Sequence, residues 1–247
     1  IGLPPGGETF FNHLGGTVEV LTGTLRLPRG DSTGGTFIVA QGATLDLNSG
    51  SQFGSYSGTY NGSGAGVVEL NSGMISSMGP GATFNLPNFH WNGGTISAGQ
   101  VFNNTGTMRL QGSGGWGING GGFTNSGTII HDGTGVLQWG ANAWMTNASG
   151  GIYDIKRDGN IANAGQIRNS GTFRKSGGSG EATIGTPAAE VYFRLLGGTV
   201  EVTSGTLKLG RSYPDSTGGT FIVGQGAVLD INGAASFPGE YTGTYQG

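Results

Sequence analysis

The sequence contains no cysteine and only three histidines, His13, His90 and His131. Without cysteine the chain has no disulfide framework and no thiolate metal site. The histidines lie far apart in the sequence, which argues against a metal site built from histidine. No P-loop, nucleophile-elbow or EF-hand spacing occurs either. We therefore expect no metal and no cofactor.

Charge and long apolar runs are also scarce. Only 10% of the 247 residues are charged, the formal net charge is -3, and the 11 lysines and arginines do not cluster. This pattern gives no electrostatic reason to expect nucleic-acid binding. No apolar run approaches the roughly 18 residues that a membrane-spanning helix needs. We expect neither a nucleic-acid partner nor membrane insertion.

Glycine, by contrast, is abundant, with 55 residues. The glycines follow no G-X-Y period, which excludes a collagen-like triple helix. Apolar residues are frequent and alternate with polar ones, so a disordered chain is also excluded. No window shows a helical period of 3.6 residues, and we expect essentially no helix.

The chain repeats itself over a long distance. LGGTVEVLTGTLRL at 14–27 returns at 196–209 with 11 of 14 positions identical, and DSTGGTFIVAQGATLDL at 31–47 returns at 215–231 with 14 of 17 identical. The offsets are 182 and 184 residues, because two residues are inserted between the two blocks in the second copy. We expect a single domain, 1–247, that holds one long unit (about 1–183) and the first third of a second (about 184–247). Any specialised function then belongs to the unrepeated middle, roughly 84–186.

A shorter period lies inside the long unit. The segments FNNTGTM, FTNSGTI, MTNASGGI and IRNSGTF place an asparagine at four positions separated by 21, 22 and 22 residues: Asn104, Asn125, Asn147 and Asn169. This spacing equals the length of one coil in a solenoid. Turn residues that recur in each coil often adopt a left-handed conformation, which asparagine and glycine tolerate. Stacked amides can also hydrogen-bond from coil to coil, so we expect an asparagine ladder.

The short segments alternate as strands do. In GTVEV, Val18 and Val20 point to one side and Glu19 to the other, and GTLRL and ATLDL repeat the pattern. Two to three such strands in each period of about 20 residues predict an all-β parallel β-solenoid of about 12 coils, a rod roughly 55–60 Å long. The alternative is an antiparallel sandwich whose hairpin turns carry the N-x-G motif. The regular period favours the solenoid, because sandwiches rarely keep one.

These repeats resemble a known class of sequence. FNNTGTMRLQG, FTNSGTI, GGTVEVTSGTLKL and GGTFIVGQGAVLDI are similar to the Gly/Thr/Asn-rich repeats of very large bacterial surface proteins. Those proteins include autotransporter passengers and filamentous-haemagglutinin-like adhesins. The resemblance covers nearly the whole chain. It implies a right-handed parallel β-helix that is exported and serves as a stalk or adhesive fibre.

The function that we expect on these grounds is structural. The chain is interpreted as a segment of a secreted or cell-surface bacterial fibre or adhesin and not as an enzyme. Its coils stack into a rod. The expected partners are further copies of itself, or further repeats, end to end, and surface polysaccharide is the second candidate partner. The expected location is extracellular or at the cell surface.

A catalytic alternative depends on one group of residues. Aligning the coils by the Asn-Gly motif places His131 near Asp154, with Lys175 one coil further along. Such a stripe, with steps of about 5 Å, could begin proton abstraction from a uronic acid in a polysaccharide-cleaving β-helix. The competing interpretation, which we prefer, is that these are ordinary strand-end and turn residues.

A carbohydrate-binding alternative rests on aromatic residues. All four tryptophans lie in the unrepeated middle, where outward rings could stack on sugars: Trp91, Trp116, Trp139 and Trp144. For any single tryptophan, packing in the core or at an end is the interpretation that we prefer. Asp31 and Asp215 recur in DSTGG, and we interpret them as Asx-turn residues and not as calcium ligands.

Overall fold

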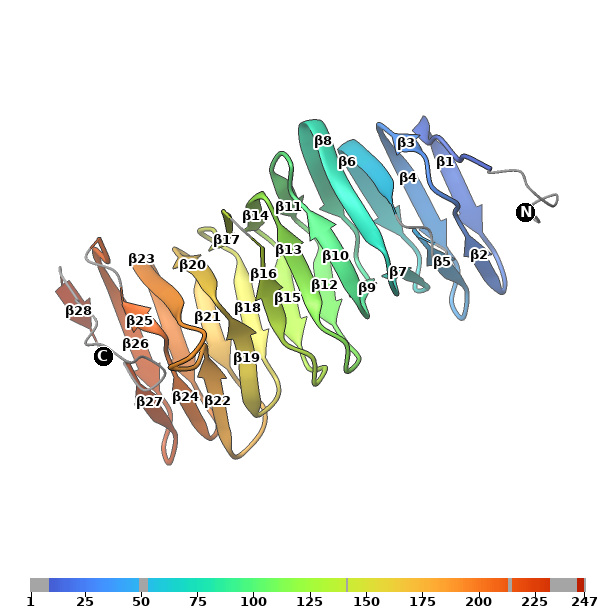
Figure 1. Ribbon diagram of the computed structural model, residues 1–247. Helices are drawn as coiled ribbons and strands as arrows, with labels where there is room; N and C mark the ends of the chain where they lie inside the picture. The colour runs from blue at the N-terminus through green and yellow to red at the C-terminus, as the bar shows by residue number, and fades with distance from the viewer. Residues whose placement is uncertain (1–8, 49–52, 141, 213–214, 232–243, 247) are drawn as a thin grey trace.

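The computed structural model of the protein describes residues 9–48, 53–140, 142–212, 215–231 and 244–246. Short strands and their connections make up this part of the chain, and they wind from the N-terminal to the C-terminal end of an elongated body (Figure 1). None of the described residues forms a helix, and so none belongs to an apolar helix that could cross a bilayer. The all-β prediction is confirmed.

The strands form three parallel ladders, and the chain visits ladders 1, 2 and 3 in turn. Ladder 1 stacks β1 (Leu14–Val20), β4 (Gly34–Val39), the second parts of β6 (Gly54–Ser63) and β8 (Met74–Asn85), β11 (Phe102–Asn104), β14 (Gly121–Asn125), β17 (Ala143–Asn147), β20 (Gly165–Asn169), the first part of β23 (Val191–Val202) and β25 (Arg211–Ser212). Ladder 2 stacks β2 (Thr24–Arg26), β5 (Thr44–Asp46), β7 (Val67–Leu70), β9 (Phe89–Trp91), β12 (Thr107–Leu110), β15 (Thr128–His131), β18 (Ile152–Ile155), β21 (Thr172–Lys175), the second part of β23, β26 (Gly218–Val223) and β28 (Thr244–Gln246). Ladder 3 stacks β3 (Asp31–Ser32), the first parts of β6 and β8, β10 (Gly94–Ser97), β13 (Trp116–Asn119), β16 (Leu137–Trp139), β19 (Gly159–Asn163), β22 (Glu181–Ile184), β24 (Thr206–Lys208) and β27 (Val228–Asp230).

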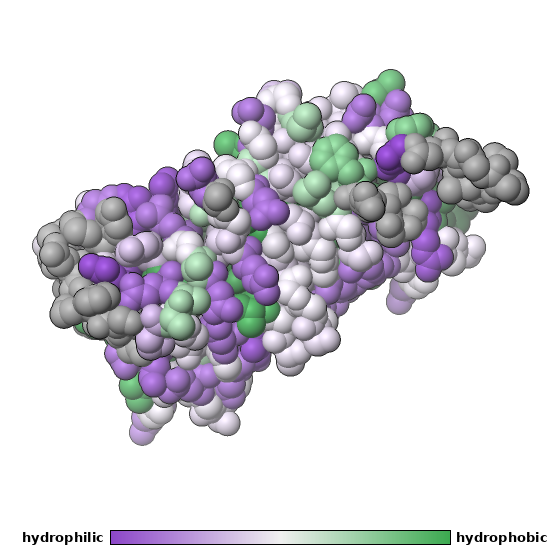
Figure 2. Space-filling view, in the orientation of Figure 1, coloured by the Kyte–Doolittle hydropathy of each residue, from purple (hydrophilic) through white to green (hydrophobic). Residues whose placement is uncertain are grey.

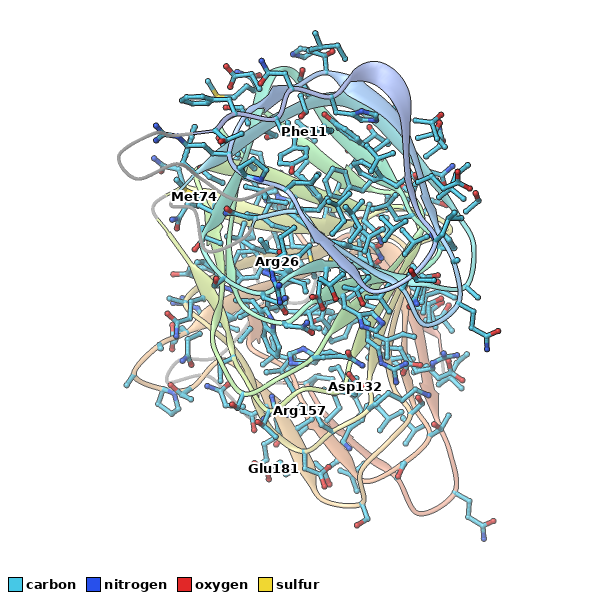
Figure 3. All side chains as sticks on the ribbon, turned by 90° about the vertical axis from the view of Figure 1, so that its right-hand side faces the viewer. Phe11, Arg26, Met74, Asp132, Arg157 and Glu181 are labelled. Atoms are coloured by element: carbon cyan, nitrogen blue, oxygen red, sulfur yellow. The ribbon has the colours of Figure 1, made fainter. Side chains whose placement is uncertain are left out.

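The hydrophobic core runs through the centre of this winding. Strand alternation fills it: Val18 and Val20 are buried while Glu19 between them is exposed. Figure 3 shows side chains filling the space that the three ladders enclose. Aromatic rings from successive turns contact one another there, as Phe102 and Phe123 do with ring centroids 5.4 Å apart. Each turn is therefore stabilised by burial against its two neighbours.

The solenoid has about ten turns and not the expected 12. The turns are unequal in length. Residues that pair between neighbouring turns are 19 apart for Val18 and Phe37, but 27 apart for Phe173 and Val200. The longer turns place extra residues in their connections, so the same chain makes fewer turns. At about 4.8 Å for each step the ten turns span about 45 Å.

The second copy of the long unit does not return to the same side of the rod. β1 lies in ladder 1, whereas its counterpart, the second part of β23, lies in ladder 2. Similarly, β2 lies in ladder 2 and its counterpart β24 lies in ladder 3. Ladder 1 takes eight steps from β1 to β23, and the chain then advances by one more side. The long unit is therefore eight and one third turns.

Glycine allows the corners of the turns to approach closely. Gly127, in the FTNSGTI segment, has an ordinary backbone conformation, but a Cβ on it would overlap the carbonyl oxygen of Gly106 on the preceding turn. Gly106 stands in the same relation to the carbonyl oxygen of Leu86. In this motif glycine is needed because a side chain would separate the stacked backbones.

The substitution Gly127→Ala tests this requirement. We expect it to destabilise the fold by about 1–3 kcal/mol, because the backbone must shift to accommodate the methyl group. Urea denaturation followed by circular dichroism measures the change. Gly16→Ala is the matched control, since a Cβ on Gly16 would meet nothing within 4 Å, and it should change stability by less than about 0.5 kcal/mol. Equal stability of the two variants would contradict the close-approach explanation.

Candidate functional site

The asparagine ladder occupies the corner between ladders 1 and 2. Asn104 Nδ2 donates to Asn125 Oδ1, Asn125 to Asn147 and Asn147 to Asn169, each at 2.8 Å. All four side chains are buried. The predicted coil-to-coil amide ladder is thus present over four successive turns.

Each ladder amide also binds the backbone of the following turn. Asn125 Nδ2 donates to the carbonyl oxygen of Ile152, and Asn147 Nδ2 to that of Thr172, both at 3.0 Å. The expected left-handed conformation is absent from these asparagines, because the non-glycine residues with positive φ in the described part of the chain are Asn142 and Ala164. Buried amides with all their partners fix the register between turns without leaving an unsatisfied polar group.

We expect Asn147→Ala to destabilise the solenoid by about 2–4 kcal/mol. The substitution leaves the Asn125 amide and the Asn169 carbonyl oxygen buried without their ladder partners. Asn85→Ala is the control, since Asn85 donates to Asn61 at 3.0 Å in an exposed pair of the same chemistry. Its expected cost is below about 0.5 kcal/mol. If the two substitutions cost the same in thermal or urea denaturation, the ladder is not a stabilising element.

The residues proposed as a catalytic stripe do not lie in one line. His131 pairs with Ile155 on the next turn, and Ile155 pairs with Lys175, so His131 and Lys175 share an inward column two turns apart. Both side chains are completely buried. Asp154 is adjacent in sequence to Ile155 and belongs to the neighbouring, outward column. The stripe expected from the alignment of the turns is therefore wrong.

A two-residue difference between turns explains the error. In FTNSGTI the strand β15 begins three residues after Asn125, whereas in MTNASGGI β18 begins five residues after Asn147. The sequence alignment matched His131 to Asp154 and so absorbed only one of the two extra residues. A slip of one residue moves a strand side chain to the opposite face.

His131 has become a core residue. Its Nδ1 lies 2.8 Å from the hydroxyl of Tyr153, and its ring stands edge-on to Trp116 with centroids 5.0 Å apart. Nε2 is buried without a hydrogen-bond partner among the described residues. Burial, aided by the nearby positive charge of Arg157, lowers the pKa of His131 to about 3. The imidazole is therefore neutral and inaccessible to a substrate.

The buried histidine makes stability depend on pH. The unfolded chain protonates it below a pKa of 6.5, whereas the folded protein excludes the proton until about pH 3. Its contribution to stability is full above pH 6.5 and is lost as the pH falls towards 3, by up to about 1.4 kcal/mol for each pH unit. We expect His131→Phe to have a flatter stability profile between about pH 6 and pH 4 in urea denaturation. Parallel profiles for the two proteins would contradict this assignment.

Asp154 and Lys175 do not contact the same partners, and each belongs to its own group of hydrogen bonds. Asp154 accepts from Arg174 at 2.7 Å and from the Ser176 hydroxyl at 2.6 Å, and Lys156 lies 3.1 Å away. Burial alone would raise the pKa of Asp154, but these hydrogen bonds outweigh it and hold the pKa below its usual value.

The ammonium group of Lys175 is held by three oxygen atoms, two of them from the connection that follows β21. Nζ donates to Asp158 Oδ1 at 2.8 Å, to the carbonyl oxygen of Gly177 at 2.6 Å and to that of Gly178 at 3.2 Å. These three oxygens satisfy all the donors of an ammonium group. Lys175 therefore holds the connection after β21 and does not point towards an outer surface.

Two of the four candidate sugar-stacking tryptophans are in the core. Trp91 and Trp116 are almost completely buried, and Trp116 Nε1 donates to the carbonyl oxygen of Trp91 at 2.7 Å. The preferred interpretation of core packing is thus confirmed for these two residues, and the alternative that their rings stack on sugars is wrong. Both occur in strands at inward positions, where a large ring fills the wide interior of a turn.

The other two tryptophans are partly exposed and differ in direction. Trp139 packs against the core, with Gly165 directly against its ring. Trp144 lies at an outward position of β17, where the guanidinium of Arg168 sits 5.0 Å from its ring centroid. Trp144 remains the one tryptophan positioned for stacking on a ligand from outside.

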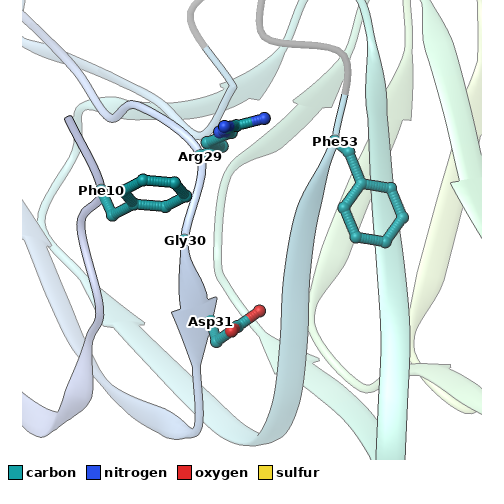
Figure 4. Close-up of a pocket in the computed structure, with 5 residues that line it drawn as sticks. All are labelled: Phe10, Arg29, Gly30, Asp31 and Phe53. Carbon is teal, nitrogen blue, oxygen red and sulfur yellow. The ribbon is translucent and has the colours of Figure 1, made fainter. Parts of the chain in front are cut away.

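A shallow hollow of about 250 Å³ lies near β3, where the sequence analysis placed no site. Phe10 and Phe53 stand on opposite sides of it, and Arg29 and Asp31 project between the two rings (Figure 4). The Arg29 guanidinium is 4.7 Å from the Phe10 ring centroid. Gly30 forms the floor, and a Cβ on it would overlap the backbone of Phe11. Stacking faces, a hydrogen-bond donor and an acceptor are thus combined at the surface.

No cluster of three or more histidine, aspartate or glutamate side chains that could hold a metal ion occurs among the described residues. Comparisons of the chain with protein-family models, with curated proteins and with solved structures find no match.

Proposed function

We propose that the protein is a structural rod segment of a secreted or cell-surface bacterial fibre or adhesin. One observation supports this most directly: about ten turns stack in register through three continuous parallel ladders. In such a stack each turn contacts mainly its neighbours, so length can be added without changing the fold. An elongated body with this property is suited to holding other parts at a distance from a surface.

The interior supports a load-bearing role. Where four turns would otherwise present apolar side chains, they carry the asparagine ladder, whose hydrogen bonds run along the rod. The backbone hydrogen bonds of all three ladders run in the same direction. A pulling force along the rod must therefore break many hydrogen bonds together.

The repetition within the chain supports extension of the rod by stacking. Its strands β23, β24, β26 and β27 stack onto the first copy through the same kind of parallel pairing that joins turns within that copy. We propose that further repeats, in the same chain or in other copies of it, extend the rod end to end in the extracellular space.

A second candidate function, carbohydrate binding, is favoured by the outer surface. The hollow beside Phe10 and the Trp144–Arg168 pair each present an aromatic ring next to a guanidinium. On the face that Figure 2 shows, hydrophobic residues form small separate groups among hydrophilic ones, which suits separate sugar contacts better than one broad apolar interface. Polysaccharide cleavage by His131, Asp154 and Lys175 is not proposed, because two of these side chains are in the interior.

The rod function is tested by locating the protein on intact cells. Antibodies raised against the 247-residue chain should label unpermeabilised cells in immunogold electron microscopy, with label on or beyond the outer surface and lost after brief protease treatment. An antibody against a cytoplasmic protein is the control and should not label these cells. Label that appears only after permeabilisation would overturn the proposal.

A further inference from the structure

The aromatic–arginine pair beside the hollow has a counterpart in the second copy of the long unit. At the 182-residue offset, Phe10 corresponds to Tyr192 and Arg29 to Arg211. The two pairs share one geometry: each arginine lies over its aromatic ring, at 4.7 Å from the centroid in the first copy and 5.9 Å in the second. An outward aromatic–arginine pair is thus retained in both copies.

An aspartate accompanies the pair in both copies. Asp31 corresponds to Asp215 at the 184-residue offset, so the aspartate is kept although two residues are inserted between it and the arginine. In the first copy the backbone amide of Asp31 donates to Asn12 Oδ1, and in the second the carboxylate of Asp215 accepts from Arg194, which stands at the position of Asn12. In the second copy the aspartate thus lies next to Arg194, which is two residues along β23 from Tyr192.

These residues are not needed to fill the core. Phe10 is 58% exposed and Phe53 is 39% exposed, and the Asp215 side chain is 46% exposed. Large rings usually become buried, so two exposed rings on opposite sides of one hollow form a candidate surface for a ligand. The charges at the first group balance, with one arginine and one aspartate. At the second group Glu190 and Asp215 balance Arg194 and Arg211.

We propose that each aromatic–arginine–aspartate group binds one sugar residue of a neutral polysaccharide. The aromatic ring packs against the apolar C–H face of the sugar. The guanidinium donates to hydroxyl or ring oxygens, and the carboxylate accepts from hydroxyl groups. The balanced charge of both groups favours a neutral ligand over an anionic one, and the hollow of the first group, about 250 Å³, accommodates a single ring. This inference rests on the carbohydrate-binding candidate and is independent of the rod function.

The two groups face different directions. The first lies on the side of ladder 3, next to β3, and the second lies on ladder 1, where Tyr192 pairs with Arg211. They are eight and one third turns apart, or about 40 Å along the rod. One straight polysaccharide strand cannot contact both, so a single rod cross-links separate strands. Binding to a polymer network then gains strength from two weak contacts.

Affinity electrophoresis of the full chain tests the proposal. The probes are native gels that contain β-glucan, mannan, galactan or xylan, with alginate and heparin gels as anionic comparisons. We expect slower migration in at least one neutral gel, unchanged by added salt. The combined variant F10A/F53A/Y192A/D215N should migrate as it does in a gel without polysaccharide. F10A/F53A and Y192A/D215N should each lose part of the retardation.

Two further variants separate loss of binding from unfolding and from non-specific effects of removing exposed side chains. D31N/D215N keeps the shape of both groups and should also weaken retardation. L21A/M78A removes exposed apolar side chains elsewhere, 64% and 49% exposed, and should behave as the wild type. Circular dichroism must show an unchanged β spectrum for all variants. Retardation that survives in the combined variant would refute these sites and leave carbohydrate binding elsewhere on the chain intact. No retardation in any gel, or retardation only in anionic gels, would refute both the proposed sites and the binding of neutral carbohydrate by the chain. The rod function would still stand.

Discussion

The spacing of about 4.8 Å between stacked turns is the constraint on which the rest of the structure depends. At this spacing the strands of neighbouring turns form backbone hydrogen bonds with one another, and equivalent positions of successive turns come into contact. Each position along a turn thereby becomes a column, and a residue is tolerated only if it suits the one before and the one after it. Three columns meet this requirement in different ways. One has glycine at Gly127, one has the asparagine ladder, and one alternates in charge along Asp154, Arg174 and Glu201.

The same constraint separates structure from chemistry. Polar side chains that point into the interior, such as those of His131 and Lys175, form hydrogen bonds with nearby residues and become part of the core. The outward columns remain available for recognition, and they present each side chain next to its counterparts on neighbouring turns. An aromatic ring with an arginine on the following turn, as Tyr192 has in Arg211, is a natural unit of such a surface.

How much of this could be read from the sequence depended on whether the signal was periodic. Strand alternation around Val18 and the recurring asparagines report directly on the fold, because each turn repeats them. The number of turns and the positions of His131 and Asp154 depended on insertions of a few residues, and a single slip inverts a strand. Trp91 and Trp116 could not be placed, because a ring suits either face. The groups at Phe10 and Tyr192 gave no periodic signal, because these residues lie outside the two most similar blocks of the copies and meet their arginines only across neighbouring turns.

The fractional length of the long unit has its own consequence. Eight and one third turns rotate each copy by a third of a revolution relative to the previous one, so three copies return to the starting orientation after 25 turns. In an array of such units, any feature fixed to the unit is distributed along a single spiral around the axis, with three units to each revolution of that spiral. The fibre then has no front or back. It presents the same features in every direction around its axis. Two fibres that lie side by side therefore cannot align the same face along their whole length.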